Sequence, residues 1–111
     1  MNKYLFLVLS FVFLLTTSSS AAVYKGQKVF IKKCLKCHDG GQVFVAEKKI
    51  RTWKKLMKKK GTALADLHLE DRKAKDSWKY FKSRKYTKKS KHLKDFLVEY
   101  AKDSGNAPAC D

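Results

Sequence analysis

The chain has 111 residues, of which 26 are Lys or Arg and 10 are Asp or Glu, so its formal net charge at pH 7 is +16. A charge excess of this size is informative about binding partners and rates of association, but it does not indicate the fold. The length leaves room for one small domain and excludes a multidomain architecture; a domain this small often needs a metal, a disulfide or a cofactor to supplement its core.

The first 22 residues have the layout of a secretory signal peptide. Lys3 gives a positive start, Tyr4–Leu15 is almost purely apolar, and Ser20–Ala22 is a run of small residues that suits cleavage. The apolar run is shorter than the about 20 residues that a transmembrane helix needs. We therefore predict cleavage after Ala21 or Ala22 and export to the periplasm. The alternative is an uncleaved N-terminal membrane anchor.

Cleavage would leave one domain at residues 23–103 with a short tail at 104–111. Only Lys3 is lost among the charged residues, so the mature formal charge is +15, one less than that of the whole chain. Three cysteines remain, Cys34, Cys37 and Cys110, and an odd number does not make a closed disulfide framework.

Hydrophobic periodicity predicts an all-α domain of three to five short helices. Phe30, Cys34 and Cys37 share one face of the first, and Leu93 and Phe96 belong to the apolar stripe of the last. In chain order we expect a helix at Gly26–Cys37 ended by Asp39–Gly41, a helix capped by Thr52 and ended at Gly61, a turn or two around Leu64–His68, a helix capped by Ser77, and a helix at Ser90–Lys102.

The pentapeptide Cys34–His38, CLKCH, is the motif that is most informative about function. A redox CxxC site would need a thiolate at a helix N-terminus, but these cysteines lie near a predicted helix C-terminus. A structural zinc site would need four ligands, and the chain has no second closely spaced ligand pair. CxxCH is also the attachment signature of a c-type haem, in which both sulfurs add to porphyrin vinyl groups and the histidine binds the iron. We predict that Cys34 and Cys37 hold haem c covalently and that His38 is an axial ligand.

The residues around the motif extend this prediction. Gly26 and Phe30 lie eight and four positions before Cys34, and Leu93 and Phe96 lie in the last predicted helix. In these positions the sequence resembles the small monohaem class I c-type cytochromes of the bacterial periplasm. The resemblance implies a cytochrome c-like fold around one haem, in which the two terminal helices cross with Gly26 at the close approach.

The sixth iron ligand is not apparent from the sequence. The family supplies a methionine shortly before the C-terminal helix, but this chain has the lysine-rich stretch 82–91 there. Met57 is the first candidate, with core packing as its alternative role. His68, His92 and an open sixth position are the others.

The resemblance implies an electron carrier, not an enzyme. Lysine runs at 54–55, 58–60 and 88–89 make the surface strongly positive, which favours acidic redox proteins as partners and anionic membrane headgroups as secondary ones. Nucleic acid is a poor partner for an exported haem protein. The alternatives are a haem that binds a small gas at an open position and a dedicated subunit of a larger oxidoreductase. We expect a monomer, with a dimer linked through Cys110 as the alternative.

Overall fold

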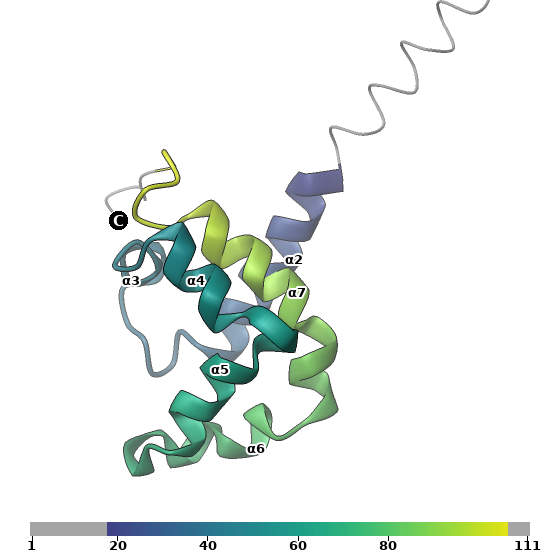
Figure 1. The fold of residues 1–111 in the computed structure, drawn as a ribbon, viewed down its shortest axis with the longest axis vertical. Helices are drawn as coiled ribbons and strands as arrows, with labels where there is room; N and C mark the ends of the chain where they lie inside the picture. Colours follow the sequence, from purple (N-terminus) through teal and green to yellow (C-terminus); the bar gives the residue numbers. More distant parts are fainter. Residues whose placement is uncertain (1–17, 107–111) are drawn as a thin grey trace, which may run out of the picture.

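The computed structural model describes residues 18–106, and within this range the chain is mostly helical and has no strand. The all-α prediction is therefore confirmed. The helical elements of the described range are α2 (Ser18–Lys33), α3 (Gln42–Val45), α4 (Ile50–Leu56), α5 (Lys58–Leu69), the 3₁₀ helix η1 (Arg72–Ser77), α6 (Trp78–Phe81) and α7 (Arg84–Glu99) (Figure 1). They outnumber the three to five helices predicted, because α3 and η1 are short elements that carry no periodic signal. The helix predicted after Ser77 is α6, although Ser77 makes no side-chain cap bond there.

The core is built on the crossing of α2 and α7, which lie against each other (Figure 1). Gly26 is buried at the contact with α7, and Phe30 packs on Phe96 with 5.3 Å between their ring centroids. Leu93 and Phe96 are each 1% exposed. The two terminal helices thus cross at Gly26, as the resemblance implies.

Both of these helices begin earlier than predicted. The first, α2, starts at Ser18, inside the segment assigned to the signal peptide, and ends at Lys33 rather than Cys37. The last, α7, starts at Arg84 rather than Ser90, and Ser83 caps it by accepting a hydrogen bond from the backbone N–H of Tyr86. The start of α7 is not apparent from the sequence because half of the residues at 84–89 are lysine, although buried Tyr86 and Ser90 extend the stripe of Leu93 and Leu97.

The start of α4 corrects the cap predicted at Thr52. The helix begins at Ile50, and Lys49 occupies the N-cap position without a side-chain cap bond. The carboxylate of Asp103 accepts a hydrogen bond from the N–H of Ile50 at 2.8 Å, and the N–H of Lys102 donates to the carbonyl of Lys48 at 2.9 Å. The first turn of α4 is therefore capped by a residue 53 positions away along the chain and not by a local side chain.

The junction of α4 and α5 is a kink. Lys59, Lys60 and Gly61 have φ values of 51°, 58° and 75°, in the left-handed region. The helix predicted to end at Gly61 ends at Leu56, and Gly61 instead lies in a break within α5, which resumes after it. The Tyr86 hydroxyl donates a buried hydrogen bond of 2.6 Å to the Gly61 carbonyl, which ties the kink to α7. No helix within residues 18–106 is long and apolar enough to cross a membrane.

Candidate functional site

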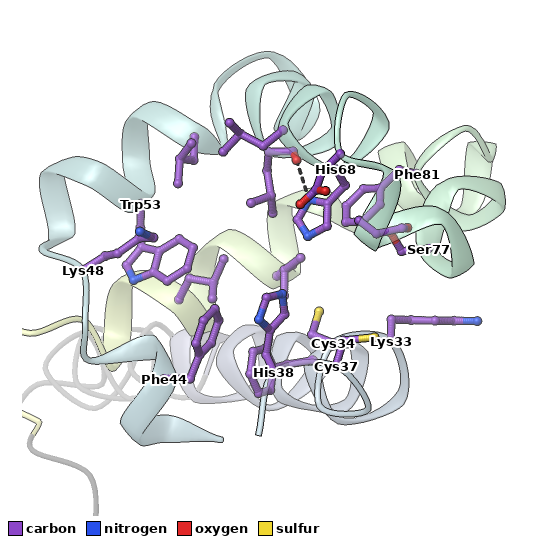
Figure 2. A pocket seen from close by; sticks show the side chains of 18 of the residues that line it. Lys33, Cys34, Cys37, His38, Phe44, Lys48, Trp53, His68, Ser77 and Phe81 are labelled. Atoms are coloured by element: carbon purple, nitrogen blue, oxygen red, sulfur yellow. Dashed lines mark hydrogen bonds between the residues drawn. The ribbon is translucent and has the colours of Figure 1, made fainter. Parts of the chain in front are cut away.

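A cavity of about 420 Å³ lies between the end of α2 and the inner sides of α4, α5 and α6 (Figure 2). Its walls are mostly apolar and include Phe30, Trp53, Leu64 and Leu97. Its volume falls in the range of about 300–1,000 Å³ that is usual for ligand and cofactor sites.

The CLKCH turn forms one wall of this cavity. After α2 ends, the backbone N–H groups of Cys37 and His38 both donate to the carbonyl of Cys34, at 3.1 and 2.9 Å. This single turn places Cys34, Cys37 and His38 together on the cavity wall. Gly40 and Gly41 then adopt φ values of 95° and 55°, which lets the chain turn away, as the glycine pair predicts.

The two cysteines do not look like a redox pair. Both are free thiols, Cys34 half-buried and Cys37 exposed. Burial, aided by the charge of Cys37, raises the pKa of the Cys34 thiol to about 12, so this thiol stays protonated at neutral pH. A reactive redox cysteine needs the opposite shift. Zinc binding is also poorly served, because within residues 18–106 no group of three or more His, Cys, Asp or Glu side chains is placed to hold a metal ion.

His38 faces the cavity with its ring stacked on Phe44, at 4.2 Å between ring centroids and 18° between planes. Burial lowers the pKa of His38, and the nearby charge of His68 lowers it further, whereas Glu47 acts in the opposite direction. A neutral imidazole is the form that binds a metal.

His68 comes from α5 on the other side of the cavity (Figure 2). Its ring centroid lies 6.0 Å from that of His38, with the two planes at 90°. On its other side the ring stacks on Phe81 at 4.2 Å. Two histidines from distant parts of the sequence therefore meet across one apolar space.

The other two candidates for the sixth ligand lie elsewhere. Met57 is 3% exposed and packs in the core at the α4–α5 junction, and it is not among the residues that line the cavity. His92 lies at the crossing with α2, also off the cavity wall, where its Nδ1 atom is buried without a hydrogen-bond partner.

Three lysines reach the rim of the cavity: Lys33, Lys48 and Lys73 are exposed and line it. Asp71 is the single acidic residue among those that line it. The rim is therefore positive, which suits a ligand that carries carboxylates.

Sequence reasoning missed the aromatic residues that support the histidines. Phe44 lies under His38 and Phe81 under His68, and the indole N–H of Trp78 donates to the backbone carbonyl of His68 at 2.7 Å. The aromatic residue types were visible, but nothing in their spacing says which histidine each one contacts.

The chain matches no family model, no curated protein and no solved structure.

Proposed function

We propose that the protein is a periplasmic c-type cytochrome that carries single electrons between respiratory redox partners. Cys34 and Cys37 would hold one haem c through thioether bonds, and His38 would bind its iron. The observation that carries this proposal is the turn that brings these three side chains together on the wall of an apolar cavity of about 420 Å³.

The residues present fit a haem. The attachment needs two sulfurs and an imidazole on one side of the porphyrin, and one turn of chain offers all three. The apolar walls suit the macrocycle, and the positive rim formed by Lys33, Lys48 and Lys73 suits its two carboxylates. When bound, the haem supplies an iron that gains and loses one electron reversibly.

The chain around the site would keep water away and hold the ligand in place. Phe44 fixes the plane of the His38 ring, and buried Trp53 closes the far wall, where its indole N–H is satisfied by the carbonyl of Val45 at 2.9 Å. Few polar groups of the wall need to reorient when the charge on the iron changes. The apolar surroundings of a cofactor are one of the means by which a protein tunes it.

The surface charge indicates the partners. A formal charge of +16 on 111 residues would attract acidic redox proteins and increase the rate of encounter at low salt. Anionic lipid headgroups are the secondary partner, since they attract clustered lysines for the same reason. An electron carrier of this kind is not itself an enzyme.

The test is to produce the full chain in a bacterium that matures c-type haem in its periplasm. We expect intact-mass analysis of the denatured protein to show the polypeptide plus one haem, and the visible spectrum to show covalent haem bands. Cys34→Ala and Cys37→Ala should each remove one thioether, whereas Cys110→Ser, whose position lies outside the described residues, should leave attachment unchanged. A polypeptide mass without haem, in cells that mature a control cytochrome, would overturn the proposal.

A further inference from the structure

We infer that His68 is the second axial ligand of the iron, so that the site is a bis-histidine haem in which His38 and His68 bind from opposite sides. The inference rests on the proposed function, because it needs a haem attached at Cys34 and Cys37. It assigns the ligand position that the sequence left open between Met57, His68, His92 and none.

The distance between the two rings suits a shared metal. An imidazole nitrogen binds a first-row metal at about 2 Å, so two imidazoles on opposite sides of one ion have ring centres roughly 6 Å apart. The ring centroids of His38 and His68 are 6.0 Å apart, the two ring planes are at 90°, and the two side chains lie on opposite sides of the cavity (Figure 2). The residues already stand at the separation that an iron between them requires.

The tautomer of His68 is set by its own helix. Its Nδ1 atom lies 2.8 Å from the backbone carbonyl of Leu64. A carbonyl oxygen only accepts hydrogen bonds, so Nδ1 must carry the hydrogen. The lone pair is then on Nε2, the nitrogen that points into the cavity (Figure 2). Metal-binding histidines usually have their other ring nitrogen held by such a partner.

The position of His68 is also supported from behind. Its ring stacks on Phe81, which is 9% exposed, and its backbone carbonyl accepts the indole N–H of Trp78 at 2.7 Å. Both contacts come from α6, which leaves little freedom for the ring to swing away. A ligand held in place before the metal arrives loses little conformational entropy on binding.

The competing residues are occupied in other ways. To bind the iron, Met57 would have to leave the core, where its side chain is buried against Gly61. The packing there is tight, because a Cβ atom added at Gly61 would lie 3.2 Å from the Cε atom of Met57. To bind the iron, His92 would have to leave the α2–α7 crossing, where its backbone carbonyl lies against Gly26. Either change would disrupt the packing that shapes the cavity.

Bis-histidine ligation predicts a definite chemical character. With both axial positions filled by protein, the iron is low-spin, and the potential lies below that of a histidine–methionine haem. No position is open for a gas, so the protein would be an electron carrier and not a gas sensor.

The wild-type holoprotein gives the first test. We expect the oxidised spectrum to lack the weak near-infrared band of methionine-bound haem, the electron paramagnetic resonance spectrum to be that of two imidazoles, and the reduced protein to bind carbon monoxide slowly or not at all. A methionine band, or rapid carbon monoxide binding at neutral pH, would overturn the assignment of His68 while leaving the covalent haem, and so the proposed function, intact.

Variants make the assignment specific. His68→Ala should give a high-spin haem that binds carbon monoxide rapidly, and His68→Met should bring the near-infrared methionine band and a higher potential. Met57→Leu and His92→Asn are the matched controls and should keep the wild-type spectrum. If His68→Ala does not fold, the spectra of His68→Met and Met57→Leu still test the assignment of His68. The inference would be contradicted if Met57→Leu altered the spectrum and His68→Met did not.

Discussion

Gly26 of α2 lies directly against the backbone carbonyl of His92 in α7. A Cβ at Gly26 would collide with this carbonyl and come within 2.7 Å of the Phe96 Cβ atom. The nearest neighbours are thus backbone and the first atom of a buried side chain, which move only if a helix moves. This contact sets how closely the two terminal helices approach and therefore where α2 presents the CLKCH turn.

Gly26→Ala should destabilise the protein by about 1–3 kcal/mol, as overpacking does. The sign of the change in stability is informative, because replacing glycine by alanine in a solvent-exposed helix would stabilise the helix by roughly 0.5–1 kcal/mol. Urea unfolding followed by circular dichroism measures the difference. Lys25→Ala, on an exposed neighbouring position, is the control and should change stability by less than about 0.5 kcal/mol. A stabilised Gly26→Ala variant would mean that the crossing is loose.

Tyr86→Phe should cost about 0.5–1.5 kcal/mol, because it removes the buried hydrogen bond from the hydroxyl to the Gly61 carbonyl without changing the volume of the ring. Local hydrogen exchange should rise at the kink of Lys59–Gly61, whose left-handed backbone this bond holds. Tyr24→Phe is the matched control, since Tyr24 is 57% exposed. Equal stability of the two variants would show that the hydroxyl does not support the kink.

Stability should fall at alkaline pH because of two tyrosines, half-buried Tyr80 and buried Tyr86. Burial raises the pKa of Tyr80 to about 12, and it raises the pKa of Tyr86 as well. An unfolded tyrosine titrates near pH 10, so above that pH the unfolded chain releases protons that the folded chain keeps. The free energy of unfolding should therefore decline from about pH 10 to about pH 12. Urea titrations across this range should show a shallower decline for Tyr80→Phe, and an unchanged slope would contradict the assignment.

If the protein carries a haem as proposed, its positive charge should affect the rate at which the haem exchanges electrons with charged reagents. With an anionic reagent such as ferricyanide the oxidation of the reduced holoprotein should slow as salt rises, and with a cationic cobalt complex it should accelerate. Stopped-flow absorbance measures both rates.

The position of the charge should also matter. Lys33→Glu and Lys73→Glu reverse charges at the cavity rim and should slow the reaction with ferricyanide several-fold at low salt. Lys89→Glu makes the same change in net charge at an exposed residue that does not line the cavity, and should have a smaller effect. Equal effects of the three variants would indicate that net charge alone steers the reagent.

Much of the architecture follows from local patterns in the sequence. The apolar stripe that contains Leu93, Phe96 and Leu97 predicts a helix with one buried face, and the glycines after His38 predict where the chain turns. The boundaries were less predictable. Thr52 looks like a cap for α4, but the carboxylate that meets the first turn belongs to Asp103, and only the folded chain brings that residue close.

The sequence by itself determined the all-α class and the clustering of Cys34, Cys37 and His38, because each depends on residues that are close together along the chain. The close approach of Gly26 to His92 joins opposite ends of the domain, and it was expected only from the family resemblance. The tertiary structure alone decided which side chain stands opposite His38. From the sequence, His68 and Met57 are both plausible candidates for the sixth iron ligand. In the folded chain His68 lines the cavity, whereas Met57 is buried in the core. This difference depends on the left-handed kink at Lys59–Gly61 and on its bond to Tyr86, a contact between residues 25 positions apart that no local pattern encodes.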